Sequence, residues 1–263
     1  MVPIITLTTD FGLSDPYVAS VKGVILSINP RARLVDISHQ VPPQDILHGA
    51  FLLSTAWRSF PKGTLHLAVV DPGVGTKRKA VAVSFKGHSF LAPDNGLLSL
   101  VLGGGASSTL PSQARAYAIT NPRYRLKRVS STFHGRDIFA PAAAHLSRGL
   151  PIRRLGPSLK RLVTLDVAFP VRERDGSLRG AVLHVDAFGN LVTNIRKEDA
   201  KGDITVEVAG KSIPKLSETF ADAVGLLALW GSSDYLEIAV RNGNAAALLG
   251  VKRGDPALVR PKR

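Results

Sequence analysis

Hydrophobic positions in the first 150 residues form short apolar runs that alternate with longer segments of helical periodicity. Residues 3–9 (PIITLTT) have the pattern of a buried strand. A helix is expected to follow, with Ser14 and Pro16 typical of its start and Asn29-Pro30 of its end. Further strands are expected at 34–38, 65–70, 80–85 and 89–92, and further helices at 43–60 and 138–148. This alternation predicts an α/β domain with a central, mostly parallel sheet.

The pattern changes after residue 180, where short apolar runs are separated by turn signals such as Ala209-Gly210. Such spacing is typical of a small antiparallel barrel or sandwich. The stretch between the two patterns is rich in Pro, Arg and Gly and has weak periodicity. The expected organisation is an N-terminal α/β domain over residues 1–160, a linker over 161–179 and a smaller all-β, barrel-like domain over 180–263.

The amino-acid composition excludes several kinds of functional site. The 263 residues include no cysteine, which excludes disulfides, thiolate nucleophiles and cysteine-ligated metals. No apolar run approaches the ~18 residues of a membrane span, and Asp10 and Asp15 interrupt the N-terminus where a signal peptide would be apolar. We therefore expect a soluble, cytoplasmic protein.

The formal net charge of +14 would attract nucleic acid or another anionic surface. The densest basic stretches, residues 123–128 and 153–161, lack the interleaved aromatic residues of a base-stacking platform. A solvated surface is the favoured interpretation of both stretches, and RNA binding stays open as an alternative.

Two strand ends carry candidate chemistry, because ligand sites in open α/β sheets gather where strands end. Asp10, in TTDFG, can accept hydrogen bonds from a sugar diol or can simply form a turn. In VVDPGVGTKRKAVAV (69–83), a short turn between two strands would bring Asp71 and Arg78 side by side. The glycines of this stretch match neither a P-loop nor a dinucleotide loop. A structural ion pair is the alternative interpretation.

A third candidate precedes the helix expected from residue 138. His134, in STFHGRD, lies near the start of that helix, where the local potential favours a neutral ring that can accept or relay a proton. Asp137 is expected to be the helix N-cap. In the second domain, DAFGN contains Asp186 and Asn190; Asn190 can read an adenine edge or can belong to an ordinary hairpin.

Six motifs in register, TTDFG, PQD, VDPGVG, PDNGLL, FHGRD and DAFGN, resemble the S-adenosyl-L-methionine hydroxide adenosyltransferase family over roughly residues 4–260. The resemblance implies hydrolysis of S-adenosyl-L-methionine to adenosine and L-methionine, without cofactor or metal. It also implies that Asp71, Arg78 and His134 form a catalytic triad that orients and activates a water. A homotrimer is implied as well, with each ligand between the α/β domain of one subunit and the β domain of its neighbour.

The substrate-binding residues that the resemblance implies come from both domains. Asp10 matches a ribose-binding carboxylate, Asp186 the group that faces the methionine ammonium, Asn190 an adenine contact and Ser232 the position that holds the methionine carboxylate. The remaining matches are Phe11, Gly135 and Tyr235. Because the substrate is a cation, we expect Asp10, Asp71 and Asp186 to make the pocket acidic despite the overall positive charge.

Related halogenating enzymes resemble this chain but carry tyrosine at the place of Asp71, and the fluorinating branch also carries serine at the place of Gly135 and a long insertion. Asp71, Gly135 and the lack of that insertion favour hydrolysis. A halide-dependent, chlorinase-like transferase and a non-catalytic adenosine- or RNA-binding protein are the alternatives.

Overall fold

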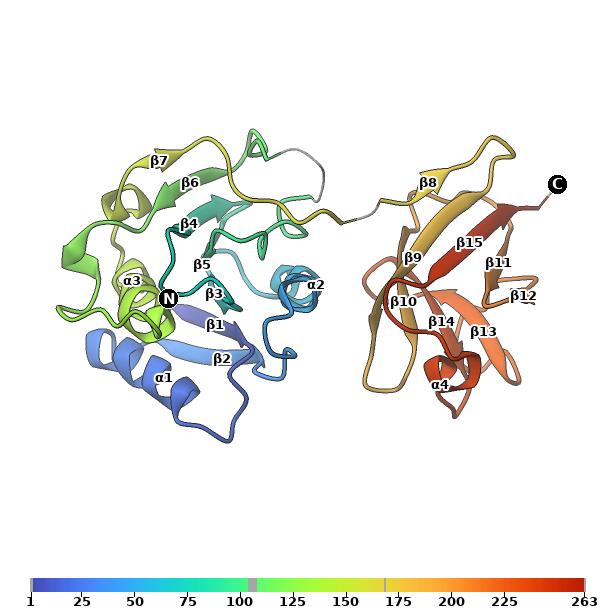
Figure 1. Ribbon diagram of the computed structural model, residues 1–263, viewed down its shortest axis with the longest axis horizontal. Coiled ribbons are helices and arrows are strands. Elements are labelled where there is room, and N and C mark those ends of the chain that lie inside the picture. The colour runs from blue at the N-terminus through green and yellow to red at the C-terminus, as the bar shows by residue number, and fades with distance from the viewer. Residues whose placement is uncertain (1, 104–107, 168, 263) are drawn as a thin grey trace. The chain divides into compact units, whose positions relative to one another are not determined.

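A computed structural model describes residues 2–103, 108–167 and 169–262 of the chain. They form two compact units, Met1–Val167 and Ala168–Arg263, which are described separately (Figure 1). Within the described ranges, no helix combines the length and apolar character that a membrane crossing requires. The cytoplasmic location expected from the sequence stays a prediction.

The first unit is built on a seven-stranded sheet in the order β2-β1-β3-β5-β4-β6-β7. Its strands are β1 (Ile4–Thr9), β2 (Arg33–Ser38), β3 (Leu65–Val69), β4 (Ala80–Phe85), β5 (His88–Pro93), β6 (Arg115–Ala118) and β7 (Ser158–Leu159). The expectation of a mostly parallel sheet is wrong, because the sheet is mixed. Strands β2, β1, β3 and β5 run parallel, whereas β4, β6 and β7 pair antiparallel.

The reversal of direction comes from a two-residue turn between β4 and β5. Lys86 and Gly87 both have positive φ, at 48° and 84°. Positive φ at both central residues is the geometry of a tight hairpin, whereas a parallel connection needs a long crossover. The turn therefore makes β4 an antiparallel partner of β5.

Helices cover both faces of this sheet. Helices α1 (Tyr17–Ile28) and α3 (Ala140–Ser147) pack with one set of buried strand residues, and α2 (Ile46–Ala56) packs with the set on the other face. Figure 1 shows α1 and α3 together on one side of the strands and α2 on the other. Short 3₁₀ turns occupy Trp57–Ser59, Pro122–Tyr124 and Ile152–Leu155.

Three local expectations about the helices need correction. Helix α1 starts at Tyr17 after Pro16, without the side-chain cap expected from Ser14. Helix α2 is shorter than expected, with Asp45 as its N-cap, whose carboxylate accepts from the His48 N–H. The segment before α3 forms a π-helical turn, Gly135–Phe139, and Asp137 lies inside it.

Asp137 is fully buried and is not an N-cap. Its carboxylate accepts hydrogen bonds from the Arg136 guanidinium (Nε to Oδ1, 2.6 Å) and from the Ser130 N–H (2.8 Å). Burial raises the pKa of Asp137, but the bonds from Arg136 and Ser130 outweigh it and leave the pKa below its usual value. This ion pair fixes the loop that leads into His134.

The second unit is an all-antiparallel sheet, in agreement with the all-β, barrel-like expectation. Seven strands follow the order β12-β11-β15-β9-β10-β14-β13, β8 pairs with β9, and the outermost strands β12 and β13 contact each other. Its elements are β8 (Val171–Arg172), β9 (Leu178–Val185), β10 (Leu191–Arg196), β11 (Ile204–Val208), β12 (Lys211–Ile213), β13 (Leu226–Trp230), β14 (Tyr235–Val240), α4 (Ala245–Leu249) and β15 (Pro256–Pro261).

The segment 161–179, expected as a linker, contains ordered contacts at both ends. The Val163 N–H donates to Asp94 of the first unit (2.8 Å) and the Leu165 N–H donates to the Ser99 hydroxyl (2.8 Å). Strand β8 then pairs with the start of β9.

Strand register places two candidate carboxylates next to each other. In the parallel pair β1–β3, Thr9 lies opposite Val69, the last residue of β3. Asp10 follows Thr9 directly and Asp71 comes two residues after Val69. Both carboxylates thus leave the sheet at the same edge, the carboxyl ends of its parallel strands.

A buried histidine pair stabilises the sheet beneath this edge only while it is uncharged. His66 on β3 bonds to the Thr6 hydroxyl through Nδ1 (2.8 Å) and to His88 Nδ1 through Nε2 (3.2 Å), and it stacks on Phe90. Burial, and secondarily the charge of His88, lower the pKa of His66 to about 3. The folded protein therefore keeps His66 neutral in mild acid.

We expect this histidine to make the first unit acid-sensitive. The unfolded chain protonates His66 below about pH 6.5, so the free energy of unfolding falls by ~1.4 kcal/mol per pH unit, or about 2 kcal/mol by pH 5. Urea unfolding between pH 7.5 and 5, followed by Trp57 fluorescence in a Trp230→Phe background, measures this slope. Adding His66→Gln should remove the His66 share of the slope; equal slopes in the two proteins would contradict the prediction.

Candidate active site

Arg78 holds Asp71 through a two-bond contact. Arg78 Nε donates to Asp71 Oδ1 (2.9 Å), Nη2 donates to Oδ2, and both side chains are at least nine-tenths buried. The pairing expected from the sequence is confirmed, but the expected hairpin is wrong, because β5 lies between β3 and β4. The loop joining β3 to β4 therefore crosses the end of β5, and the guanidinium ties the two ends of that loop together.

The same guanidinium reaches His134. Arg78 Nη2 lies 2.7 Å from His134 Nδ1, which joins residues 56 positions apart in the chain. Arginine has no acceptor atom, so Nδ1 must accept this bond and the ring proton must be on Nε2. Burial lowers the pKa of His134, and the positive charge of Arg78 lowers it further. His134 is thus neutral, as expected, with Nδ1 occupied and Nε2–H as its remaining polar group.

A glycine permits the two loops of this site to meet. Gly75 has φ +80°, and a Cβ atom there would come within 2.4 Å of the Ser131 carbonyl oxygen. A side chain at position 75 would therefore push the Asp71–Arg78 loop away from the segment that carries His134.

Asp10 faces the same space from the end of β1. Its Oδ2 accepts a hydrogen bond from the Gln44 N–H (2.9 Å). Burial raises the pKa of Asp10, the backbone bond from Gln44 opposes the rise, and the charge of Asp71 adds to it. Two carboxylates therefore share one region, and the charge of Asp71 disfavours ionisation of Asp10.

A cavity of about 370 Å³ contains these groups. Its lining residues are Asp10, Phe11, Tyr17, Pro43, Gln44, Val69, Asp71, Pro72, Val74, Thr132, Phe133, His134 and Gly135. Among the described residues, no lysine or arginine lines it, although residues 1–167 carry 20 of the chain's 34 Lys and Arg and only 8 of its 20 Asp and Glu. The cavity wall is thus locally acidic, as expected for Asp10 and Asp71, within a basic unit.

Three aromatic rings form one wall of this cavity. Phe11, Tyr17 and Phe133 pack edge to face, with centroids 5.3–6.1 Å apart. Gly135 lies against them, and a Cβ atom there would come within 3.2 Å of the Phe11 ring. The wall presents an apolar, aromatic surface beside the two carboxylates.

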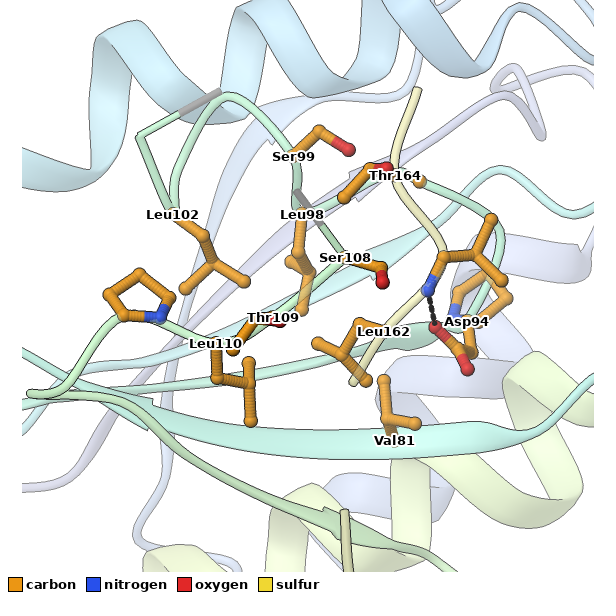
Figure 2. Close-up of a pocket in the computed structure, with 14 residues that line it drawn as sticks. Val81, Asp94, Leu98, Ser99, Leu102, Ser108, Thr109, Leu110, Leu162 and Thr164 are labelled. Carbon is orange, nitrogen blue, oxygen red and sulfur yellow. Dashed lines mark hydrogen bonds between the residues drawn. The ribbon is translucent and has the colours of Figure 1, made fainter. Parts of the chain in front are cut away.

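A second cavity of the first unit is lined by residues other than the candidates. Figure 2 shows this space of about 150 Å³, which is lined mainly by apolar side chains such as Val81, Leu98 and Leu162. Asp94 at its edge is bonded to the Val163 N–H. The larger, open cavity is therefore the candidate site.

The candidate residues of the second unit lie in two hairpin turns. Asp186 and Asn190 belong to the β9–β10 turn, where Asp186 Oδ1 accepts from the Phe188 and Asn190 N–H groups and Oδ2 accepts from Asn190 Nδ2 (2.9 Å). The hairpin interpretation of Asn190 is therefore confirmed. One amide hydrogen of Asn190 is used within the turn, while its Oδ1 is not part of these bonds.

Ser232 is exposed in the β13–β14 turn, and Tyr235 is buried at the start of β14. The Tyr235 hydroxyl accepts from Arg196 Nη2 (2.6 Å), and the Arg196 guanidinium also lies over its ring. Tyr235 is therefore bonded to Arg196, whereas Ser232 is exposed to solvent.

Glu237 is a further titratable residue of the second unit, to which the sequence motifs assign no role. Burial, and secondarily the nearby charge of Asp186, raise its pKa. Its carboxylate packs against Gly231, where a Cβ atom would come within 1.8 Å of Oε1. Only the fold brings Glu237 next to Asp186 and Gly231, so no local motif signals it. Gln44, Tyr17 and Phe133 of the first unit were likewise not given roles.

Family models match both units of the chain. The SAM hydroxide adenosyltransferase N-terminal domain matches residues 5–156, and the C-terminal domain of the same family matches residues 180–258.

Relatives of known name span nearly the whole chain. The (R)-S-adenosyl-L-methionine hydrolase of Thermus thermophilus is 41% identical over 257 residues, covering 94% of this chain and 96% of the relative. The hydrolase of the same name from Methanocaldococcus jannaschii is 35% identical and covers 94% and 92%. A fluorinase of Nocardia brasiliensis is 31% identical and covers 96% and 95%.

Solved structures share the fold. A conserved protein of Thermotoga maritima has a TM-score of 0.87 at 39% identity, covering 97% of this chain and 99% of that chain. A conserved hypothetical protein of Thermus thermophilus has a TM-score of 0.79 at 39% identity, covering 99% and 100%.

The contacts of His134 predict two opposite changes of its pKa. Arg78→Gln removes a positive charge and should raise the pKa of His134, whereas Asp71→Asn removes a negative charge and should lower it. Nitrogen-15 NMR of the ring should also show the Nε2–H form of the neutral imidazole in the unmodified protein. An Nδ1–H form, or shifts of the same sign in the two variants, would contradict the geometry.

Proposed function

The chain belongs to the SAM hydroxide adenosyltransferase family, and on that basis we propose that it hydrolyses S-adenosyl-L-methionine to adenosine and L-methionine. The observation that carries the proposal is the contact of one guanidinium with both Asp71 and His134 at the wall of an acidic cavity. The 35–41% identical relatives named as hydrolases of this substrate support it.

The substrate makes the reaction possible without a cofactor. Its sulfonium sulfur leaves the 5′ carbon as a neutral thioether, so a bond from water oxygen to that carbon forms while the carbon–sulfur bond breaks. The remaining barrier has two sources: water is a weak nucleophile, and its oxygen must line up with the carbon and the sulfur. A fixed geometry in the site lowers both contributions to the barrier.

We assign the orientation of water to Asp71 and His134. The Nε2–H of His134 would donate to one lone pair of the water, and Asp71 would accept one of its hydrogens, so that the second lone pair faces carbon. As the oxygen–carbon bond forms, the water protons become strongly acidic, and a carboxylate is basic enough to take one. Arg78 is a positioning residue, because its donors bond both Asp71 and His134.

The acidic cavity supports a cationic substrate and disfavours a halide ion. Asp10 and Asp71 both line the cavity, whereas Arg78 lies behind Asp71 and is absent from the described lining. In this proposal Asp10 binds the ribose diol and the aromatic wall of Phe11 and Tyr17 packs beside it. Asp186, Asn190 and Ser232 would bind the methionine and adenine ends, with Gly135 leaving room next to Phe11.

Asp71→Asn should separate binding from chemistry. The amide keeps the shape of the side chain but cannot take a proton, so we expect hydrolysis to fall at least ~100-fold while adenosine affinity changes by less than about threefold. Chromatography of adenosine release and calorimetry with adenosine measure the two effects. Asp166→Asn, which removes an exposed carboxylate of the same unit, is the control and should be unchanged.

Two results would overturn the proposal rather than the role of Asp71 alone. Formation of 5′-chloro-5′-deoxyadenosine from the substrate and chloride would indicate halide-dependent transfer. Binding of adenosine, or salt-sensitive retention of RNA, without any turnover by the unmodified protein would indicate a binding protein. Unchanged turnover in Asp71→Asn would remove the triad from the mechanism.

We further propose a homotrimer in which the second unit of one copy covers the cavity of another. Large apolar side chains are exposed near the second unit's candidate turns, including Phe188, at 77% exposure between Asp186 and Asn190, and Leu248 on α4. Leu13 and Tyr17, at the start of the first unit's α1 region, are also exposed. A second copy that buries these surfaces would complete the site.

Sedimentation equilibrium at micromolar concentration should give three times the chain mass. Phe188→Asp should weaken the association and raise KM, because a charged group would be buried at the proposed contact. A monomer that hydrolyses the substrate at full rate would contradict the trimer while leaving the hydrolysis intact.

A further inference from the structure

A chain of polar contacts runs from the buried Thr9 and His39, next to the turn that carries Asp10, to Asp36 and Lys22 at the surface. Thr9 Oγ1 lies 2.7 Å from His39 Nδ1, His39 Nε2 lies 3.1 Å from Asp36 Oδ1, and Lys22 Nζ donates to Asp36 Oδ2 (2.6 Å). Thr9 and His39 are 2% and 4% exposed. These contacts join strand β1 to β2, to the residue that follows β2 and to helix α1.

The direction of each contact follows from its neighbours. The Phe11 N–H donates to Thr9 Oγ1 (3.3 Å), so the hydroxyl hydrogen of Thr9 is free to be donated to His39 Nδ1. A ring that accepts through Nδ1 carries its proton on Nε2, which faces the Asp36 carboxylate. Burial raises the pKa of Asp36, but its contacts with Lys22 and His39 outweigh it and hold the pKa below its usual value. The ionised carboxylate therefore lies on the N–H side of the imidazole and favours this tautomer.

His39 also contacts the far side of the turn. Its backbone oxygen accepts a hydrogen bond from the Gly12 N–H (2.9 Å), and Gly12 adopts a positive φ of 66°. His39 therefore holds the Asp10–Gly12 turn twice, through Thr9 before Asp10 and through Gly12 after Phe11. The Asp10 carboxylate sits between these two attachments.

We propose that His39, with the Asp36 carboxylate facing its Nε2, is a positioning residue that fixes the turn carrying Asp10 for substrate binding. The inference rests on the proposed function, because it assigns the held carboxylate to the ribose. The order carboxylate, imidazole, hydroxyl is also that of a hydrolase triad, but Thr9 is buried and its hydroxyl is already bonded on both sides. A nucleophilic Thr9 is therefore ruled out by access, and support of the turn remains.

Loss of the imidazole should weaken substrate binding more than chemistry. A misplaced Asp10 loses a contact made equally in the ground state and the transition state, which raises KM and leaves kcat nearly unchanged. One charge-assisted hydrogen bond corresponds to roughly a tenfold change. We expect His39→Ala to raise KM and the adenosine Kd about tenfold, with kcat within about threefold.

Two conservative variants separate the two ends of the imidazole. In His39→Asn, the amide oxygen takes the place of Nδ1 and can still accept from Thr9, so KM should return to near its original value. In His39→Gln, the amide extends toward Asp36 and leaves Thr9 without its acceptor, so KM should stay high. Thr9→Val should raise KM at least as much as His39→Ala, because it removes the same bond and also the acceptor of the Phe11 N–H. Adding His39→Ala to Thr9→Val should change KM little further. His145→Asn, on α3 outside the cavity lining, is the control.

Hydrogen exchange gives a readout that needs no substrate. The Phe11 and Gly12 amides should exchange faster in His39→Ala and Thr9→Val, and as in the unmodified protein in His39→Asn. Unchanged KM and unchanged exchange in His39→Ala, or equal defects in the Asn and Gln variants, would overturn the inference. Absence of hydrolysis in the unmodified protein would instead overturn the proposed function, and the exchange and adenosine measurements would still decide the role of His39.

Discussion

The candidate site depends on one guanidinium. Arg78 donates two bonds to Asp71 and one to His134, and these three residues come from two loops that meet where Gly75 lies against Ser131. The planar, always charged fork of arginine can hold a carboxylate and an imidazole together, which a lysine ammonium cannot do with the same geometry. The guanidinium charge is balanced by Asp71, and His134 is neutral, so the triad carries no net charge. Asp10 then supplies the net negative charge of the cavity.

This local balance explains how a basic protein can present an acidic pocket. Most of the positive charge of the first unit lies on its surface, where ~0.15 M salt screens charges over about 8 Å. The Asp10 and Asp71 carboxylates line the cavity directly and are less screened because they are half-buried or buried. The net charge of the whole chain therefore predicts little about the ligand of this cavity.

Sequence patterns indicated candidate residues that the fold brings together, such as Asp71, Arg78 and His134, but not the architecture that does so. The ends of β1 and β3 were recognisable as apolar runs followed by Asp and Gly, and Asp71 and Arg78 do pair. The hairpin inferred for them was wrong because chain order does not reveal that β5 inserts between β3 and β4. Asp137 was misassigned because N-cap preference is local, whereas its partners Arg136 and Ser130 draw it into a buried ion pair. Glu237 and Gln44 gain their neighbours only through tertiary structure.

In the proposed mechanism Asp71 faces the 5′ carbon, and the charge of this group then decides which nucleophile the site favours. A halide brought within ~4 Å of a carboxylate is repelled by about 4 kcal/mol at an effective dielectric constant of 20, and Arg78 behind the carboxylate cancels only part of this. Water carries no charge, donates a hydrogen bond to the same carboxylate and can lose its proton there. Asp71 thus opposes halide and assists water by the same charge. In that mechanism the pairing with Arg78 holds the carboxylate next to an electron-poor carbon, which links the buried salt bridge to the choice of reaction.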